Sequence, residues 1–451
     1  MIRIGTILLR RLALLLALAI LPAAARALTI QPVVSSGGVT AWLVEDHSLP
    51  IVSLELSFRG GAATEPKDKD GLARMTTALL DEGAGDLDSQ AYQAKLEDLA
   101  SSIRFDASQD YVTAALTTVT RNVDPVFDLL RLSLTAPRFD PEPVARIRAD
   151  LIAAAAERAE NPNAIAHRIW WHNAFGDHPY ARPTDGTAAS LAAITVDDLK
   201  RFIRDRFGRD VLTIAVVGDI TADALKALLD RTFGALPAHA APVELAEATP
   251  DAAGALLLAK KPIPQSVAAF GEPGPKRDDP DWYAAYIDNY ILGGGGFASR
   301  LMQEVRVKRG LAYGVYTYLV PMLHSGVILG GVATQNARIE ESISLIRAEW
   351  RRMHDKGPTA EELANAKTYL NGAFPLQLDS TRRIAGVLIQ LQQDKLGIDY
   401  LDHRAALING VTLDDAKRVA RRFFDPARLG FAVVGTPTGL KPTREVSATG
   451  G

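Results

Sequence analysis

The strongest constraint on the fold of this chain is an internal repeat. Residues 195–218 align with residues 412–435 at an offset of 217 residues without a gap, and half of the 24 aligned positions are identical. Each copy starts with a threonine and two aspartates, continues as an amphipathic stretch and ends in a short apolar run closed by glycine. This pattern predicts a capped helix followed by a strand. Because the offset is close to half of the chain, the sequence predicts two similar domains in tandem.

Within each half, the pattern mixes strands and helices. Strand-like stretches in the first half cover residues 39–47, 50–61 and 110–120, and helical periodicity covers residues 90–103 and 141–160. The second half has helical stretches near residues 279–292, 339–356 and 359–376. We therefore expect an α+β protein in which each domain is a mostly antiparallel sheet with helices packed on one face.

The domain boundaries are predicted from the same pattern. Residues 238–254 are rich in alanine and proline and lack strong periodicity, which is typical of a linker. We therefore place one domain at residues 28–237, a second at residues 255–440 and a flexible tail at residues 441–451.

Residues 1–27 have the pattern of a secretory signal peptide. Arg3, Arg10 and Arg11 precede an apolar run over residues 12–21, and small residues follow it. The run is shorter than the roughly 20 residues that a transmembrane helix needs. Because the chain has no cysteine to carry a lipid or a disulfide, we expect a periplasmic protein with no stable membrane anchor after signal cleavage.

The segment after the second predicted strand, residues 68–85 (DKDGLARMTTALLDEGAG), resembles the zinc-binding segment of pitrilysin or insulinase-type metallopeptidases. In active members of that family, a Gly-Leu-x-His-x-x-Glu-His segment supplies two histidine ligands and a glutamate general base. Gly71 and Leu72 match this pattern, but Arg74, Thr77 and Ala78 replace the histidine, the glutamate and the second histidine. These three side chains offer zinc no suitable lone pair, so we predict no metal site and no cofactor in this chain.

Other residues do not replace the lost ligands. The third family ligand, a glutamate roughly 75 to 80 residues further on, corresponds to an alanine run at residues 153–156, and Glu157 is displaced from it. No two of the eight histidines have the i,i+4 spacing that places two ligands on one helix face. We expect His167 and His172 to be polar positions of a helix, and His178 to be structural in a following turn.

Residues 293–318 (GGGGFASRLMQEVRVKRGLAYGVYTY) resemble the most recognisable segment of the second domain of the same family. No Gly-Lys-Ser/Thr follows the four glycines, so we expect a flexible entry to a helix rather than a phosphate loop. The helix is predicted over residues 297–309, with Phe297, Leu301 and Val305 on one stripe and Gly310 as its C-terminal cap. A strand is predicted to follow over residues 311–318.

The resemblance implies catalytic roles for Arg306 and Tyr313. In family members, residues at these positions reach across a chamber to the peptide at the zinc centre. A guanidinium can donate to substrate carbonyls or to a carboxylate, and a phenol can donate to the oxyanion of a tetrahedral intermediate. Without the resemblance, the simpler interpretation is a surface ion pair of Arg306 with Glu304 or another neighbouring residue, and a core position for Tyr313.

Loss of the zinc motif together with retention of Arg306 and Tyr313 matches the non-catalytic subunit of heterodimeric members of the family. The resemblance implies half of a clam-like chamber, a homologous partner that holds zinc, and peptide substrates. The net charge of −3 favours neither nucleic acid nor an anionic membrane as a partner. Two alternatives stay open: a structural or peptide-holding protein with the same fold, and an independent metalloenzyme with unusual ligands.

Overall fold

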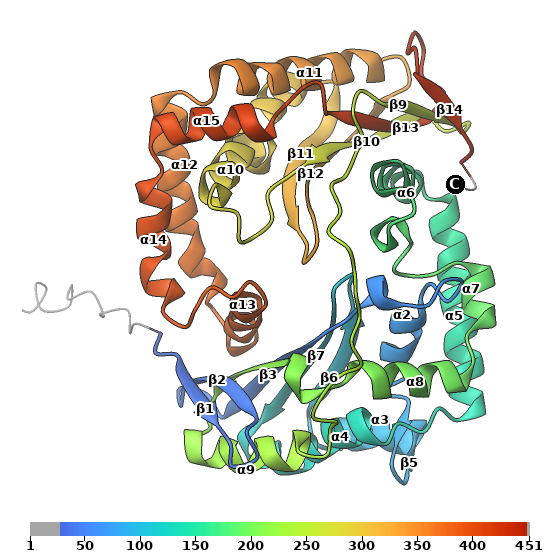
Figure 1. The fold of residues 1–451 in the computed structure, drawn as a ribbon, viewed down its shortest axis with the longest axis vertical. Coiled ribbons are helices and arrows are strands. Elements are labelled where there is room, and N and C mark those ends of the chain that lie inside the picture. The colour runs from blue at the N-terminus through green and yellow to red at the C-terminus, as the bar shows by residue number, and fades with distance from the viewer. Residues whose placement is uncertain (1–27, 449–451) are drawn as a thin grey trace, which may run out of the picture.

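Residues 28–448 form two halves, each built on a six-stranded sheet, in a computed structural model of the chain (Figure 1). The segment predicted as a signal peptide lies outside these residues. The strands of the first sheet are β1 (Gln31–Val34), β2 (Thr40–Glu45), β3 (Ile51–Arg59), β6 (Ser102–Ala107), β7 (Tyr111–Val119) and β8 (Leu212–Gly218). Those of the second sheet are β9 (Leu256–Lys260), β10 (Gln265–Pro273), β11 (Ala312–Pro321), β12 (Gly326–Gln335), β13 (Gly430–Gly435) and β14 (Arg444–Val446).

The spatial order is β1-β2-β8-β3-β7-β6 in the first sheet and β11-β12-β10-β13-β9-β14 in the second. Only the pairs β2–β8, β9–β13 and β9–β14 are parallel among the described strands of these sheets. The structure therefore confirms two tandem, mostly antiparallel domains.

Helices connect the strands in both halves. The first half contains α2 (Leu72–Thr77), α3 (Ser89–Asp98), α4 (Val123–Thr135), α5 (Pro141–Glu160), α6 (Pro162–Phe175), α7 (Ala188–Ala193), α8 (Val196–Arg206) and α9 (Ala222–Phe233). The second half contains α10 (Trp282–Asn289), α11 (Ile339–Lys356), α12 (Ala360–Ala373), α13 (Thr381–Gln393), α14 (Tyr400–Gly410) and α15 (Leu413–Phe423). The predicted helices at residues 141–160 and 339–356 are confirmed with their bounds. Over residues 28–448, none of the helices combines the length and the apolar composition that a membrane span requires.

The sequence repeat forms the same structural unit twice. Thr195 and Thr412 cap α8 and α15, and each makes a capping box with Asp198 or Asp415 three residues later. The strands that follow, β8 and β13, each lie between one parallel and one antiparallel neighbour. The two copies of the repeat therefore form the same capped helix followed by a strand, and the two strands occupy equivalent positions in their sheets.

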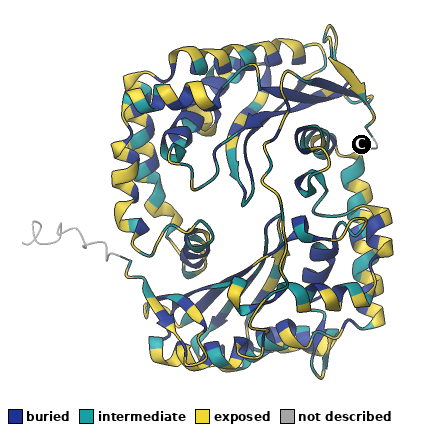
Figure 2. Ribbon diagram, viewed as in Figure 1, coloured by how far each residue is buried: buried dark blue, intermediate teal, exposed yellow. Residues whose placement is uncertain are grey.

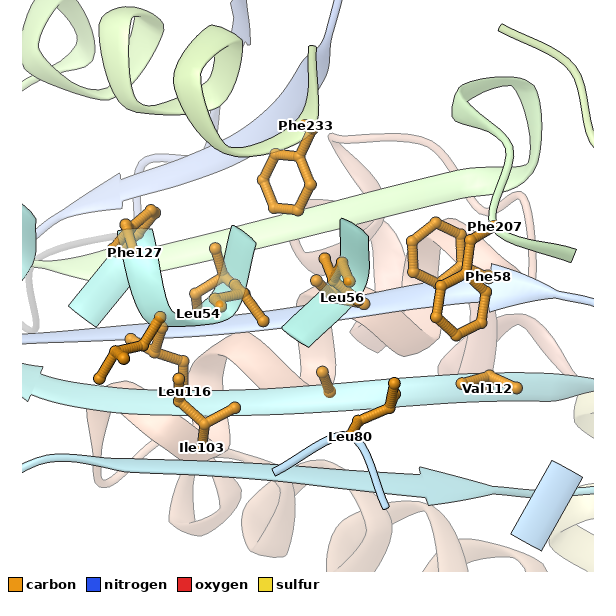
Figure 3. Packing of buried hydrophobic residues seen from close by; sticks show 14 of the residues in the cluster. Leu54, Leu56, Phe58, Leu80, Ile103, Val112, Leu116, Phe127, Phe207 and Phe233 are labelled. Carbon is orange, nitrogen blue, oxygen red and sulfur yellow. The ribbon is translucent and has the colours of Figure 1, made fainter. Parts of the chain in front are cut away.

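Each sheet buries its outer face under the helices of its own half. In the first half, Leu54, Leu56 and Phe58 of β3 point into this core, and the rings of Phe58 and Phe207 stack with centroids 4.5 Å apart (Figure 3). Figure 2 shows the buried residues gathered along both sheets and on the helix sides that face them. This arrangement confirms the prediction of helices packed on one face of each sheet.

Each half contributes one helix that covers the inner face of the other half's sheet. Helix α6 of the first half packs on the second sheet, where Trp170 belongs to one buried cluster with Val267 and Ala269 of β10. Helix α13 of the second half packs on the first sheet, where Leu388 belongs to a cluster with Val217 of β8. Each helix lies between the two sheets (Figure 1). The exchange joins the two halves through buried apolar surface.

Two predicted segments differ in the structure. The helix predicted over residues 90–103 ends at Asp98, because Ala100 adopts the left-handed conformation with φ +47° and Ile103 enters strand β6. The tail predicted to be flexible contains β14, which adds a parallel strand to the edge of β9. An unpaired strand edge satisfies its backbone groups by such an addition, which explains why this part of the tail is ordered.

Residues 238–254 contain no helix or strand and run from one half to the other. The segment is held at both ends by backbone hydrogen bonds. Ala241 N donates to Asp205 O at 2.8 Å in the first half, and Ala248 N donates to His324 O at 2.8 Å in the second.

Burial of Glu55 predicts a pH-dependent stability. Glu55 lies on β3 two residues after Ser53, whose Oγ is 2.9 Å from Thr381 Oγ1 of α13. Burial raises the pKa of Glu55 to about 7, and the charge of Arg382 opposes this shift. Between pH 4.5 and 7, the unfolded chain ionises Glu55 while the folded chain keeps its proton, so the free energy of unfolding falls as pH rises.

Glu55→Gln is expected to reduce this fall by about 1 to 3 kcal/mol, because glutamine cannot ionise. Urea unfolding of the wild type and the variant at a series of pH values between 4.5 and 8 measures the difference. Other buried carboxyl groups titrate in both proteins, so the comparison isolates Glu55. Equal pH dependence in the two proteins would contradict the prediction.

Candidate functional site

The degenerate zinc motif forms helix α2 and the turn before it. Gly71 has φ +89°, and a Cβ at this position would lie 2.9 Å from Gly186 Cα, so the turn requires glycine. Glu65 accepts hydrogen bonds from the N–H groups of Gly71 at 3.0 Å and Ala73 at 2.7 Å, and burial raises the pKa of Glu65 to about 8. The matching glycine is therefore explained by the fold alone.

The three positions of the lost ligands are filled by other interactions. Arg74 Nη1 lies 2.8 Å from Asp106 Oδ1 of β6, and Arg74 Nε lies 3.8 Å from Asp185 Oδ1. Thr77 is buried, and its hydroxyl donates to Arg74 O at 2.9 Å. Ala78 ends the helix. A guanidinium with two carboxylate neighbours now occupies the place that the resemblance assigns to a cation.

Helix α5 does not supply a replacement ligand. Arg158 Nη1 lies 3.5 Å from Asp185 Oδ2, so a second guanidinium stands beside the same carboxylate. Glu157 is exposed. Among residues 28–448, no three histidine, aspartate or glutamate side chains are grouped so that they could hold a metal ion. The side chains at this site do not fit zinc, because two arginines repel a cation and only carboxylates engaged in ion pairs remain.

The histidines occupy structural positions. His167 and His172 lie on α6, as predicted, and burial lowers the pKa of His167. His178 Nδ1 accepts a hydrogen bond from Tyr180 N at 3.2 Å, and its Nε2 lies 3.0 Å from Ala246 O. These contacts confirm the structural role predicted for His178, which fixes the turn to the segment between the halves.

The first two of the four glycines, Gly293 and Gly294, pack against strand β11 rather than forming a flexible entry. Residues Tyr290–Gly294 form a π-helical turn, and a Cβ at Gly293 would lie 2.4 Å from Thr317 Oγ1 of β11. Asn289 Nδ2 donates to Thr317 O at 3.4 Å beside this contact. The prediction of a flexible loop is therefore wrong for Gly293 and Gly294, where glycine is needed so that the turn can cover the outer edge of β11.

The single α-helix predicted over residues 297–309 is replaced by two shorter helical segments of different types. A 3-10 turn covers Gly296–Ala298, and a π-helix covers Met302–Val307. Leu301 and Val305 are fully buried, whereas Phe297 is 58% exposed, so Phe297 does not belong to the buried stripe. Gly310 adopts φ +59°, and its N–H donates to Arg306 O at 2.9 Å, which confirms the predicted cap.

The structure brings Arg306 and Tyr313 together. Arg306 Nη1 donates to Tyr313 O at 2.5 Å, and its guanidinium carbon lies 4.3 Å from the centroid of the Tyr313 ring. The ring of Phe297 lies on the guanidinium as well, at 4.6 Å. Glu304 pairs with Lys308 and Arg309 instead, so the simpler interpretation of an Arg306–Glu304 pair is wrong. The side chain of Tyr313 is 86% exposed, so it is not a core residue either.

A cavity of about 600 Å³ lies next to this pair. Arg306, Tyr313 and Tyr316 line it together with Asn163 of α6 and Gln265 of β10. The described residues that line it include no aspartate or glutamate. The cavity therefore offers a guanidinium, phenol groups and amides, which are hydrogen-bond donors for carbonyl or carboxylate oxygens.

The two predicted site regions lie in different halves. Helix α2 belongs to the first sheet's half and β11 to the second (Figure 1). The contacts of Arg306 described above all come from its own half, whereas Arg74 is bound to Asp106 and Asp185. Among residues 28–448, the Arg306–Tyr313 pair therefore faces no group of side chains that could hold a metal ion.

Two tandem α+β domains, a first-domain helix without zinc ligands and an exposed Arg–Tyr pair in the second domain define a peptidase-like protein whose zinc-motif positions hold Arg74, Thr77 and Ala78. The chain belongs to peptidase family M16: residues 40–188 match "Insulinase (Peptidase family M16)" and residues 193–370 match "Peptidase M16 inactive domain". It is a non-catalytic member of this family.

Relatives and solved structures agree with this assignment. The chain is 29% identical over 358 residues to the "Non-peptidase homolog YmxG" of Helicobacter pylori, covering 78% of this chain and 81% of the relative. It is 24% identical to the "Uncharacterized zinc protease YmxG" of Bacillus subtilis, covering 86% and 94%. A crystal structure titled "peptidase M16 inactive domain" from Pseudomonas fluorescens superposes with a TM-score of 0.85 at 29% identity, over 92% of this chain and all of that one.

Proposed function

We propose that this chain is the non-catalytic subunit of a periplasmic zinc endopeptidase, whose homologous partner carries an intact zinc motif and holds the metal. One observation carries the proposal. The positions of the zinc motif hold an ion-paired Arg74, a buried Thr77 and Ala78, while Arg306 and Tyr313 stay together at a cavity. A chain with lost ligands and retained substrate-facing donors is suited to complete the site of another subunit.

The chemistry of the pair supports a role toward peptides. The guanidinium of Arg306 keeps donors beyond the one bound to Tyr313 O, and a rigid fork of donors suits peptide carbonyls or a carboxylate. The exposed phenol of Tyr313 can donate to an oxygen that gains negative charge during peptide hydrolysis. Zinc bound by the partner would polarise the carbonyl that is cut. In this division of labour, the present chain binds and orients the peptide.

The proposed location depends on residues 1–27. Basic residues, an apolar run and small residues follow one another there, as in a cleavable export signal. Export to the periplasm then places the mature chain together with an exported partner of the same family. Mass spectrometry of the protein from a periplasmic fraction, with an N-terminus near residue 28, is the expected result.

The function is tested with the purified chain and a zinc-bearing homologue from the same genome. Alone, the chain is expected to hold no stoichiometric zinc in metal analysis and to leave unstructured peptides intact. Added to the homologue, it is expected to raise peptide hydrolysis until the two chains are equimolar. A chelator should abolish the activity of the pair, and zinc should restore it.

The outcomes separate the alternatives. Stoichiometric zinc in this chain, or hydrolysis by this chain alone, would overturn the proposal in favour of an independent metalloenzyme. Stable complex formation with no gain in hydrolysis would favour the structural or peptide-holding protein.

A further inference from the structure

The exposed ring of Phe297 lies outside the hydrophobic cores, and it contacts the guanidinium of Arg306. Phe297 is 58% exposed and lies in the 3-10 turn Gly296–Ala298, just before the π-helix that carries Arg306. The guanidinium carbon of Arg306 is 4.6 Å from the centroid of Phe297 and 4.3 Å from that of Tyr313. Two aromatic rings thus contact the guanidinium of Arg306.

The backbone of Phe297 is fixed by the same helix. Gln303 Nε2 donates to Phe297 O at 2.7 Å, and Ser299 Oγ donates to Gly296 O at 2.7 Å. Gly296 has φ +55°, a conformation that favours glycine and turns the chain toward the helix. The turn therefore presents the ring of Phe297 at a defined place beside Arg306.

The guanidinium of Arg306 has no carboxylate partner within residues 28–448, so its charge can pair with a ligand. Its neighbours Lys308 and Arg309, by contrast, both pair with Glu304. An aromatic face holds a guanidinium without using its in-plane donors, because the attraction is directed at the ring face. The donors that do not bind Tyr313 O can therefore point into the cavity next to it.

We propose that Phe297 is a positioning residue that holds the Arg306 guanidinium ready for the peptide before the peptide binds. The inference rests on the proposed function and deepens it. A long arginine side chain loses much rotamer freedom when it is fixed, and ring contacts that exist before the peptide binds remove part of that cost from the binding step. Phe297 acts through Arg306 and does not itself touch the reacting atoms.

The kinetic test compares Phe297→Leu with Phe297→Tyr in the reconstituted pair. Leucine keeps an apolar side chain but loses the ring face, and kcat/KM is expected to fall about 2- to 10-fold. Tyrosine keeps the ring face, and kcat/KM is expected to stay within about 2-fold of the wild type. Tyr369→Leu is the matched control, because Tyr369 is equally exposed but its ring stacks on Tyr290.

A double-mutant cycle identifies the route of the effect. In an Arg306→Ala background, Phe297→Leu is expected to cause no further loss, because the residue that it positions is absent. If Phe297→Leu costs as much with alanine at position 306 as with arginine, Phe297 acts in another way and the inference is overturned.

A second test needs no partner. In ¹H–¹⁵N spectra of the arginine side chains, the Nε–H signal of Arg306, assigned by its loss in Arg306→Lys, is expected to be shifted by the two rings. It should move toward the position of free arginine in Phe297→Leu and stay near its place in Phe297→Tyr. An unmoved signal in Phe297→Leu overturns the inference whatever the kinetics.

The two proposals fail in different ways. If Arg306→Ala slows hydrolysis while Phe297→Leu does not, the inference is overturned and the proposed function stands. If Arg306→Ala leaves hydrolysis unchanged, the proposed role of Arg306 falls, and the positioning role falls with it.

Discussion

Arg306→Ala is expected to lower kcat of the reconstituted pair about 10²-fold, because the guanidinium that binds and orients the peptide at the partner's zinc is lost. The substitution shortens a side chain that lines an open cavity and removes one hydrogen bond, the one to Tyr313 O, so the fold of the subunit should persist. Tyr313→Phe, which removes only an exposed hydroxyl, is expected to act in the same direction. Steady-state kinetics with a fluorogenic peptide at saturating subunit ratio measure both effects.

Arg309→Ala is the matched control for this experiment. Arg309 is three residues away and exposed, but its guanidinium pairs with Glu304 and does not line the cavity. Loss of such a surface pair is expected to change stability by less than about 1 kcal/mol and to leave kcat unchanged. Equal rates for the Arg306 and Arg309 variants would show that the guanidinium of Arg306 plays no special part.

The local structure was predictable where a short segment contains its own signals. The threonine and the two aspartates at the start of α8 and α15 predict the capping boxes of Thr195 and Thr412. Pro141 predicts the start of α5, and the apolar run that ends at Gly218 predicts β8. Such signals depend on residues within a few positions of each other, so one sequence is enough to find them.

The exchange of α6 and α13 was not predictable. Apolar periodicity shows which side of a helix is buried, but it does not show which sheet covers that side. Trp170 packs on a sheet formed by residues after 255, and Leu388 packs on strands before 219. The sheets were therefore expected to be covered on one face, while the structure covers part of the inner faces as well.

The candidate site was predictable only in part for similar reasons. Arg306 and Tyr313 were found through resemblance, and their spacing of seven residues lets the π-helix and β11 bring them together. Phe297 was placed in the buried stripe because a regular 3.6-residue period was assumed, whereas a π-helix has a wider turn and the segment begins with a separate 3-10 turn. Asp106 and Asp185, which bind Arg74, are distant in sequence and carry no local signal.

Trp170→Ala is expected to lower the free energy of unfolding by about 3 to 5 kcal/mol, because it empties the centre of the contact between α6 and the second sheet. Trp170 is 1% exposed. A Cβ at Gly271 of β10 would lie 2.3 Å from Ile328 O and 2.9 Å from Trp170 Cζ2, so a side chain at this position would collide with both the neighbouring strand and the indole ring. The indole N–H has no hydrogen-bond partner within the described residues, so the loss comes from burial and from the cavity left behind.

Urea unfolding followed by circular dichroism measures this loss, and Leu388→Ala on α13 is the matched variant on the opposite sheet, with an expected cost of about 2 to 5 kcal/mol. Because each helix belongs to one half and packs on the other, weakening either contact should destabilise both halves together. A single transition shifted to lower urea is therefore expected for each variant. A transition that splits into two, with only one half affected, would show that the exchanged helices do not couple the halves.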